Sequence, residues 1–535
     1  MAGNAEDIGN ALGDQVLGDK FSTGQSHFSH LSSKVDLDGI QQVTYYLLPL
    51  EPQGESPPDR PGIALERGIT TQRPVNGKLA GDLARLLSPD QIRTVGPELR
   101  AALQDGTGNR GIKGSAEALI LPADTEEVSR ALAWCYERGV PVTVRGGGTG
   151  LAGGAVPDGG VVLSLERLDR IRSLDPERWR IEVEAGVRTA TVHRIALENG
   201  LLFPPDPGAS EQSTIGGNVA TNAGGPHAFR YGVTGNWVTG VEAVVPPGEI
   251  LVSGGPLRKN VAGLDLTDLM IGSEGTLGIV TSAWLRLVPA PEERGVVVGF
   301  YPDAGSGCDA IGIIMGSGIE PAALEFLDQG ALASSLGSFP AASPEKAGFA
   351  VIAETDGTSG EVRRVIAELE EAMAEGALTM PVRITDHTEI RDFWTWRDGV
   401  SFAVTAQRGG KISEDVVVPV EFLAEAVEET VAIGQKHGLP ACSWGHAGDG
   451  NLHSSFLVDL ADGEQMRRGN EAAAEAFRMA IRLGGSISGE HGIGSLKTAY
   501  VDEALGPVAV RLQAEIKRVF DPKLLLNPGK KIPLA

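Results

Sequence analysis

The segment RGGGTGLAGGAV spans Arg145 to Val156 and directly follows PVTV, which we predict to be a short buried strand. Contiguous glycines let several backbone N–H groups point at one anion, and a pyrophosphate would fit such a loop. The spacing excludes a Walker loop, because no Gly-Lys-Ser/Thr follows. It also fits a dinucleotide-binding GxGxxG poorly, because no clear helix begins behind the loop. By itself, the segment is either a phosphate-binding loop or a structural turn.

Two further glycine-rich runs follow along the chain. PPDPGASEQSTIGGNVATNAGG spans Pro204 to Gly225, and KNVAGLDLTDLMIGSEGTLGIVT spans Lys259 to Thr281. Glycine pairs, small hydroxyl residues and amides allow a chain to wrap a flat ring system with backbone contacts. Glycine accounts for 72 of the 535 residues, about twice its usual share, without a Gly-X-Y period. This pattern is typical of a backbone in close contact with a large ligand.

Strand-like and helix-like segments alternate from about Gly114 onward. Asp124 and Glu127 predict a capping box, and the apolar face of the helix behind it includes Cys135, which we expect to be a packed core thiol. Alternating strands and helices indicate an α/β arrangement. The expected strands lie at 141–144, 161–165 and 180–187, and the next helix runs from Val192 to Asn199.

The stretch from about Pro289 to Thr430 has a different character. Its helices are longer, as at 360–376, and strand-like pieces such as VVVGFY (296–301) and FAVIAE (349–354) accompany them. We expect a second domain of α+β type here.

Charge and composition exclude several classes of function. Lys and Arg number 46 and Asp and Glu 70, which gives 46 − 70 = −24 and argues against nucleic acid or an anionic membrane surface as a partner. The cysteines Cys135, Cys308 and Cys442 are too few and too scattered for a disulfide framework or an iron–sulfur cluster. No apolar run reaches ~18 residues, so we expect no membrane span.

The N-terminal region differs from the rest of the chain. MAGNAEDIGNALGDQ lacks the basic start and apolar stretch of a signal peptide, so we expect a cytoplasmic protein. Residues 1–80 are poorly periodic, and SPPDRPG, starting at Ser56, is typical of a linker or loop. We expect weak order there, or a family-specific extension.

A second group of residues has the composition of a metal site. GHAGDGNLH spans Gly445 to His453, and its Gly-Asp-Gly-Asn stretch can fold the chain back and bring His446 and His453 to one point. ISGEHGIG follows with Glu490 and His491, which need a bend if they are to share a site. The glycines that flank the pair, at 489 and 492, permit that bend. Two histidines and a carboxylate can bind zinc, manganese or iron(II) with positions left open for substrate; otherwise they are packed or surface residues.

Together, the three glycine runs resemble the FAD-binding domain of the vanillyl-alcohol oxidase/p-cresol methylhydroxylase (PCMH) superfamily. The similarity covers roughly 115–533 and is specific to the branch of D-lactate dehydrogenase, the glycolate oxidase flavin subunit and D-2-hydroxyglutarate dehydrogenase. It implies an α+β fold in which a two-subdomain PCMH-type domain holds FAD, an α+β cap (substrate) domain covers the flavin, and a C-terminal segment returns to it. We accordingly expect an N-terminal extension and lead-in, the FAD-binding domain, the cap domain with the metal site, and the flavin-contacting segment at 1–110, 111–290, 291–515 and 516–535.

The resemblance also implies which residues contact the cofactor. Relatives that tether their flavin carry a histidine where this chain has Thr149, so we expect noncovalent FAD. Asn527, in FDPKLLLNPGKKIP (520–533), would return to the flavin, unless the chain simply turns there. Pyrophosphate contacts are implied for Arg145, Gly146, Gly147, Gly148, Thr149 and Gly150. Flavin and ribityl contacts are implied for Pro205, Asp206, Ser210, Gly216, Gly217 and Asn222, with Glu274 and Ile279 near the adenosine side or the chain.

For the chemistry, the resemblance makes His446, His453 and Glu490 the metal ligands and His491 the active-site base. Asn451 would contact the substrate.

Basic residues in two other segments are candidates for substrate binding. Arg397 in WTWRDGVSF matches the Trp-x-x-Arg of the family and offers a planar fork for a substrate carboxylate, which gives it both catalytic and substrate-binding roles. Lys411, in RGGKISEDVVVP, is a weaker substrate-binding candidate, and Ser401 a minor one. The spacing from Lys411 to Pro419 is nearer the glycolate oxidase pattern, which argues against a second carboxylate pocket.

The implied reaction is the FAD-dependent, divalent-metal-assisted oxidation of a D-2-hydroxy acid such as D-lactate, glycolate or D-2-hydroxyglutarate to the 2-oxo acid. Metal chelation would lower the pKa of the hydroxyl, His491 would take its proton, and flavin N5 would accept the hydride. Zinc is the expected metal. Electrons would leave to an external acceptor: a quinone, a cytochrome, an electron-transfer flavoprotein or an iron–sulfur subunit. The alternatives are a flavin-binding subunit of a glycolate oxidase-type complex and a same-fold flavoenzyme with another substrate. A homodimer is compatible with each of these interpretations.

Overall fold

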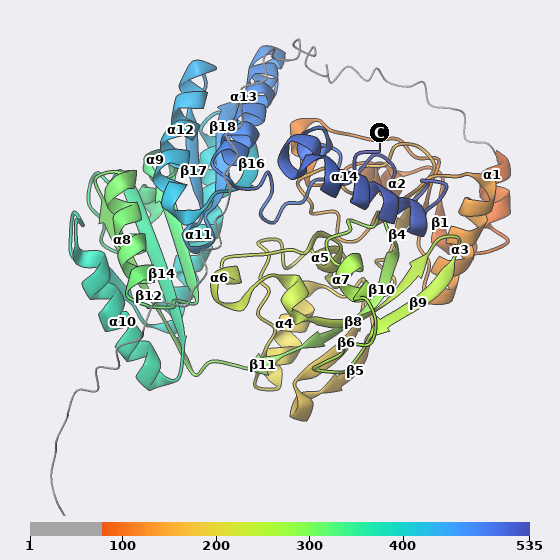
Figure 1. The fold of residues 1–535 in the computed structure, drawn as a ribbon, viewed down its shortest axis with the longest axis horizontal. Coiled ribbons are helices and arrows are strands. Elements are labelled where there is room, and N and C mark those ends of the chain that lie inside the picture. The colour runs from red at the N-terminus through yellow and green to blue at the C-terminus, as the bar shows by residue number, and fades with distance from the viewer. Residues whose placement is uncertain (1–76, 535) are drawn as a thin grey trace, which may run out of the picture. The chain divides into compact units, whose positions relative to one another are not determined.

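The computed structural model describes residues 77–534, all of which belong to the unit Ile69–Ala535 (Figure 1). The interpretations made for residues 1–76, the SPPDRPG linker among them, lie outside the described residues. Within 77–534, no helix is both long enough and apolar enough to cross a bilayer. The cytoplasmic location stays a prediction.

The first α/β layer contains the first glycine run. Its sheet has the order β1-β2-β4-β3, in which β2, β4 and β3 are parallel, and α3 packs between this sheet and the next. The elements are α1 (Gly77–Leu83), β1 (Ile92–Arg93), α2 (Pro97–Ala102), β2 (Ala118–Ile120), α3 (Thr125–Arg138), β3 (Val142–Arg145) and β4 (Val161–Ser164).

The second layer is an antiparallel sheet with the order β5-β6-β10-β8-β9. Its strands are β5 (Ile171–Asp175), β6 (Arg180–Glu184), β8 (Val238–Val245), β9 (Glu249–Gly254) and β10 (Ile279–Arg286). The helices beside it are α4 (Thr189–Glu198), α5 (Ile215–Thr221), α6 (Ala228–Tyr231) and α7 (Leu266–Met270). A small pair, β7 (Leu201–Leu202) with β11 (Val288–Pro289), precedes the cap domain.

Residues 291–515, which we expect to form the cap domain and refer to by that name below, contain a seven-stranded antiparallel sheet with the order β15-β12-β14-β13-β17-β18-β16. Its strands are β12 (Glu293–Tyr301), β13 (Ala323–Asp328), β14 (Phe349–Gly357), β15 (Val382–Ile384), β16 (Gly410–Val417), β17 (Ala441–His446) and β18 (Asn451–Val458). Its helices are α8 (Ala304–Gly316), α9 (Gln329–Ser335), α10 (Ser359–Ala374), α11 (His387–Ala406), α12 (Leu423–Lys436) and α13 (Gly463–Arg482).

The two faces of this sheet are chemically different. Helices α8, α10, α12 and α13 cover one face through a continuous apolar core (Figure 1). Helices α9 and α11 pack on part of the other face. Side chains alternate along a strand, so the residues between the core positions share the second face. Glu325, Asp415 and His453 lie at such positions, which brings polar groups from distant parts of the chain to one side of the sheet.

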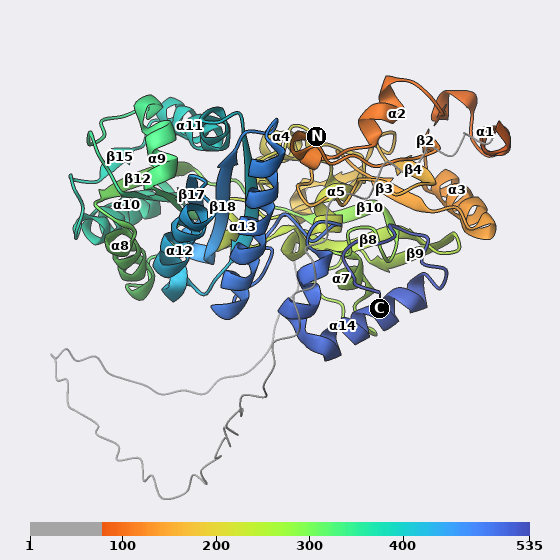
Figure 2. The same ribbon diagram turned by 90° about the horizontal axis from the view of Figure 1, so that it is seen from above.

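The C-terminal segment joins the first sheet. Helix α14 (Val501–Phe520), kinked at Gly506, packs Ile516 and Phe520 against the core of the second layer (Figure 2). The chain then runs beside β3, where the Val142 N–H donates to Leu525 O at 2.8 Å and the Asn527 N–H donates to Val142 O at 2.8 Å. The last segment therefore lies against the strand that leads into the first glycine run.

The elements expected from the sequence all occur, with ends that differ by at most three residues. Asp124 caps α3 by accepting the Glu127 N–H at 2.8 Å. The expected capping box is only half formed, because the Glu127 carboxylate accepts from the Ala123 N–H and from Gln91 instead. Cys135 is buried in the core, and burial raises the pKa of its thiol to about 12.

Replacement by alanine should have opposite effects on stability at two glycines of α8. A Cβ on Gly307 would lie 2.1 Å from the buried Phe349 ring, whereas a Cβ on Gly312 meets nothing within 4 Å. We expect Gly307→Ala to lower the free energy of unfolding by about 1–3 kcal/mol through overpacking. Gly312→Ala should raise it by about 0.5–1 kcal/mol, because alanine loses less backbone entropy in a helix. Calorimetric unfolding of both variants tests this packing, and shifts of the same sign would contradict it.

Candidate functional site

A tight hairpin brings the two histidines of GHAGDGNLH together. Strand β17 ends at His446, a 3₁₀ turn covers Ala447–Asp449, and β18 begins at Asn451. Gly450 provides the reversal with φ +65°, in the left-handed region. The rings of His446 and His453 lie 5.4 Å apart and nearly perpendicular. The hairpin thus presents both imidazoles to one point.

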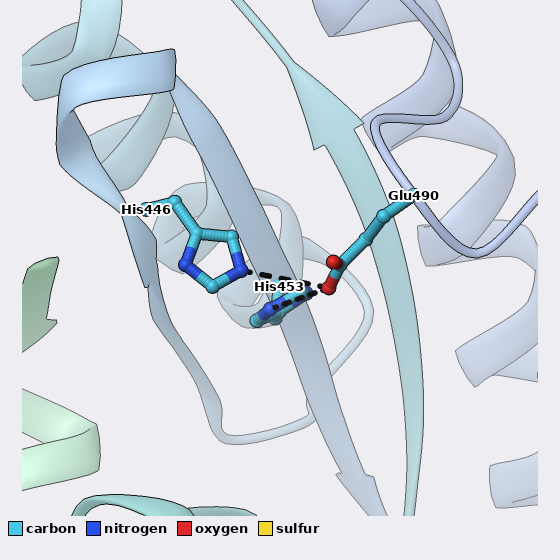
Figure 3. Close-up of side chains that lie close together, drawn as sticks. All are labelled: His446, His453 and Glu490. Carbon is cyan, nitrogen blue, oxygen red and sulfur yellow. Dashed lines mark ion pairs between the residues drawn. The ribbon is translucent and has the colours of Figure 1, made fainter. Parts of the chain in front are cut away.

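Glu490 reaches that point from a different segment. Its Oε1 lies 3.5 Å from His446 Nε2 and 3.7 Å from His453 Nε2, as Figure 3 shows. One ligand atom from each of the three side chains falls within 4.8 Å of the others. The expected bend is present, with Gly492 at φ +83°, and it brings His491 Nε2 to 4.0 Å from Glu490 Oε1. The His491 ring stacks on His453 at 5.2 Å between centroids.

Hydrogen bonding shows that these groups fit a divalent cation. Among the described residues, His446 Nε2, which faces Glu490, is buried without a hydrogen-bond partner. The other nitrogen of His446, Nδ1, lies 2.5 Å from the Glu325 carboxylate. A metal-binding histidine is usually oriented in this way, with a carboxylate behind the ring. Two imidazoles and one carboxylate leave coordination positions open, as zinc, manganese or iron(II) sites do.

The charges of the site also favour a cation. Burial lowers the pKa of His453 to about 3, with a contribution from the neighbouring His491. Burial opposes ionisation of Glu490, but the nearby histidines outweigh it and lower its pKa to about 2. Burial likewise opposes protonation of His446, but Glu325 and Glu490 raise its pKa well above the ordinary value. The metal-free cluster therefore combines an ionised Glu490 with a neutral His453, and His446 holds a proton that a bound cation would replace.

Glu325 was not expected from the sequence. It lies on β13, where one carboxylate oxygen contacts His446 and the other pairs with Arg397. Burial raises the pKa of Glu325, but His446 and Arg397 outweigh it and keep the pKa below the usual value. Two carboxylates, Glu325 and Asp328, interrupt the otherwise apolar strand ALEFLD (323–328), and this pattern is the signal that could have indicated Glu325.

Arg397 joins this network from helix α11. It is buried, pairs with Glu325 and keeps its Nε without a hydrogen-bond partner. Arg397 thus pairs with the same carboxylate that contacts His446, one of the three metal candidates. Its contact with a substrate carboxylate stays a prediction.

Asp415 is a second residue that the sequence did not reveal. Its Oδ2 accepts the backbone N–H groups of Gly489, Glu490 and His491 at 2.8–2.9 Å. Burial opposes its ionisation, but His491, Lys497 and His453 lower its pKa well below the usual range. Asp415 thereby fixes the bend that carries the metal and base candidates.

Asn451 and Lys411 are held mainly by the protein itself. The Asn451 amide donates to Asp415 Oδ1 at 2.6 Å and to Val416 O at 2.9 Å, so both of its N–H groups are used. The Lys411 ammonium donates to Ser401 Oγ at 2.6 Å and lies 4.5 Å from the Trp444 ring centroid. Burial lowers the pKa of Lys411 to about 8. A substrate contact for either residue stays a prediction.

The first two glycine runs pack against each other. Cβ atoms on Gly146 and Gly147 would lie 2.6 Å from Thr214 Oγ1 and 2.2 Å from Gln212 O, whereas Gly150 faces open space. Arg145 donates to Gln104 O at 2.7 Å, and the charges of Asp105 and Glu166 act on its guanidinium. Burial lowers the pKa of Arg145. A half-buried backbone surface beside an arginine fits a pyrophosphate.

The other flavin candidates occupy varied positions. Gly217 lies next to Gly146, and Gly216 packs against Ala185. Asp206 contacts His227 at 2.5 Å, and the Asn222 amide oxygen accepts from the Gly235 N–H. Several candidates interact chiefly with the protein: Pro205 O contacts His193, Ser210 O accepts from Ala190, Glu274 accepts from Ile493 and Gly494, and Asn527 binds Val144 and Glu274.

Thr149 and Ile279, the two remaining cofactor candidates, differ in their exposure. Thr149 is half-buried within the first run. Ile279 is fully buried in the core of the first layer, so its side chain presents no surface to a cofactor. The cofactor contacts stay predictions.

The contact between Glu325 and His446 predicts metal affinity. Glu325→Gln keeps the shape of the side chain but removes the charge behind His446 Nδ1, so we expect the affinity of metal-stripped protein for Zn²⁺ to fall ~10–100-fold. Competition with a chromophoric chelator measures this affinity.

The matched control is Glu354→Gln. Glu354 is also a buried carboxylate on the second face of the sheet, but it bonds His227 and Trp394. It should leave the affinity for Zn²⁺ unchanged. Equal losses in both variants would contradict a specific role for Glu325.

Comparison with known proteins places these sites in a family. The family profile described as "FAD linked oxidases, C-terminal domain" matches residues 290–531, and that described as "FAD binding domain" matches 116–254. The chain is 38% identical over 416 residues to glycolate oxidase subunit GlcD of Bacillus subtilis, across 77% of this chain and 88% of that protein. It is 37% identical over 428 residues to a D-lactate dehydrogenase of Anaerostipes hadrus, across 78% of this chain and 90% of that protein.

Solved structures confirm the predicted fold class. A p-cresol methylhydroxylase superposes with a TM-score of 0.71 at 19% identity, across 86% of this chain and 97% of that one. The 4-ethylphenol oxidase of Gulosibacter chungangensis gives 0.69 at 18% identity, across 86% and 97%. At this identity the likeness concerns the PCMH-type fold alone. The relatives of higher identity confirm the resemblance, and the chain belongs to the FAD-linked oxidase family of glycolate oxidase subunits and D-lactate dehydrogenases.

Proposed function

We propose that this FAD-linked oxidoreductase oxidises a D-2-hydroxy acid, such as D-lactate, glycolate or D-2-hydroxyglutarate, to the 2-oxo acid with the help of a divalent metal. One observation carries the proposal: His446, His453 and Glu490 converge within 4.8 Å beside His491. The names of the relatives support the substrate class, since they include glycolate oxidase subunits and D-lactate dehydrogenases.

His446, His453 and Glu490 would hold the metal, with zinc as the best candidate. When bound, the metal supplies a Lewis acid that lowers the pKa of a chelated hydroxyl group. Glu325 keeps the Nδ1 proton of His446 on the side away from Glu490, so that Nε2 offers its lone pair to the metal position.

His491 would act as the base. Its Nε2 faces the Glu490 carboxylate, and its ring is held parallel to His453. An imidazole is suited to accept a hydroxyl proton near neutral pH. His491 therefore takes the substrate's hydroxyl proton at Nε2 while the hydride leaves from C2. When bound, FAD supplies the acceptor for that hydride at flavin N5.

Arg397 would orient the substrate. Its guanidinium pairs with Glu325, and its Nε has no hydrogen-bond partner among residues 77–534. A planar fork of N–H donors suits a carboxylate. The substrate carboxylate would thus be held between the metal position and Arg397, which aligns C2 for hydride loss.

Electrons would then pass to an external acceptor: a quinone, a cytochrome, an electron-transfer flavoprotein or an iron–sulfur subunit. The three cysteines lie apart on α3, α8 and β17, so they do not supply a cluster for onward transfer. A second candidate is the flavin subunit of a glycolate oxidase-type complex, which is favoured by relatives named as subunits of glycolate oxidase.

Anaerobic substrate titration tests the proposal. D-lactate, L-lactate, glycolate and D-2-hydroxyglutarate are added in turn while the oxidised flavin band is followed. We expect one achiral or D-configured acid to bleach the band, and chelation of the metal to abolish this bleaching. A flavin band that no hydroxy acid bleaches, or bleaching that is insensitive to chelation, would contradict the proposal.

His491→Ala separates the base from the metal site. The rate of flavin reduction should fall ~10²–10⁴-fold, as expected for loss of a general base. The affinity for Zn²⁺ should remain close to that of the wild type, because His491 is not one of the three metal candidates. A reduction rate equal to wild type would remove His491 from the mechanism.

A further inference from the structure

Glu274 has a backbone conformation that is unusual for its residue type. Its φ of +52° lies in the left-handed region that favours glycine, although Gly272 and Gly275 stand close by. A residue other than glycine persists in such a conformation where its surroundings hold it there, and such outliers cluster at functional sites. The side chain of Glu274 therefore calls for an explanation.

The Glu274 carboxylate binds the segment that follows His491. Its Oε1 accepts the Ile493 N–H at 2.8 Å, and its Oε2 accepts the Gly494 N–H at 2.7 Å. The residue is buried, and the Lys531 ammonium lies 3.3 Å from Oε1. A Cβ on Gly492 would lie 2.9 Å from the same oxygen, so the chain packs tightly on the carboxylate. Both carboxylate oxygens are thus engaged by this loop rather than by an open cofactor surface.

Two carboxylates divide the backbone N–H groups of this loop between them. Asp415, from the cap sheet, accepts those of residues 489–491, and Glu274, from the FAD-binding domain, accepts those of 493 and 494. The N–H group between them, on Gly492, donates to Ser488 Oγ at 3.0 Å. Glu490 and His491 therefore sit in a loop that is fixed from both sides.

The main chain of Glu274 connects this loop to the glycine runs. The Glu274 N–H donates to Ala220 O at 2.7 Å, within the second run, and Glu274 O accepts from the Asn527 amide. The Ser495 and Leu496 N–H groups donate to Ala152 O, within the first run. The position of Glu490 is thus connected through Glu274 to the proposed flavin-binding backbone.

We propose that Glu274 is a positioning residue for the metal and base loop, and that its carboxylate sets the affinity for the divalent metal rather than contacting FAD. The inference rests on the proposed function of His446, His453, Glu490 and His491. It gives Glu274 a role different from the cofactor contact implied by the family resemblance.

The test uses FAD-loaded protein from which metal has been stripped, with Zn²⁺ titrated against a chromophoric chelator. Glu274→Gln keeps the volume of the side chain but places an amide where the two N–H groups need acceptors. We expect affinity for Zn²⁺ to fall ~10–100-fold while the FAD content and the oxidised flavin spectrum stay unchanged. Wild-type affinity in this variant would overturn the proposal, and so would loss of FAD.

Two further variants keep the test decisive. Glu274→Gly suits the left-handed backbone and removes the carboxylate, so a folded Gly variant with wild-type affinity for Zn²⁺ would also overturn the proposal. Glu361→Gln is the matched control, because Glu361 likewise accepts backbone and hydroxyl hydrogen bonds, but at the start of α10. It should leave the affinity unchanged. Wild-type protein that binds no Zn²⁺ would instead remove the metal site and this proposal with it.

Discussion

The contact of half-buried Glu490 with the buried His446 and His453 is the constraint on which the rest of the site depends. An ionised carboxylate and two imidazoles held away from water require either mutual neutralisation or a cation. Within residues 77–534, His446 Nε2 has no hydrogen-bond partner, while Glu325 occupies the far side of His446. The surrounding residues therefore fix the donors in place without neutralising all of them, as the proposed metal centre would require.

The cap sheet, the FAD-binding domain and one loop meet at this cluster. The cap sheet supplies the hairpin with both histidines and, on the same face, the supporting carboxylates Glu325 and Asp415. The FAD-binding domain approaches through its glycine runs; a Cβ on Gly224 would lie 3.0 Å from Glu490 Oε2. The loop that carries Glu490 and His491 is bound by carboxylates of both domains. The proposed reaction would need the metal, the base and the flavin within one substrate's length, and this shared loop supports that proposal.

Local sequence patterns predicted much of this structure. The elements at 141–144 and 360–376 depend on short-range alternation and helical periodicity, and the GDGN turn on local backbone preference. The supporting carboxylates escaped prediction, since their partners lie far along the chain: Glu325 meets His446 only because β13 pairs with β17. The family resemblance implied a place near the cofactor for Ile279, and β10 turns its side chain into the core. Long-range strand pairing decides such cases, and a single sequence does not reveal it.

X-ray absorption spectroscopy of the zinc-loaded protein tests the central claim most directly. The account predicts first-shell nitrogen and oxygen scatterers at about 2.0–2.1 Å, with the multiple-scattering pattern of two imidazoles and no sulfur. The same measurement on His453→Asn should show one imidazole fewer. A zinc ion with sulfur ligands, or one with no imidazole signature, would contradict a metal centre built from His446, His453 and Glu490.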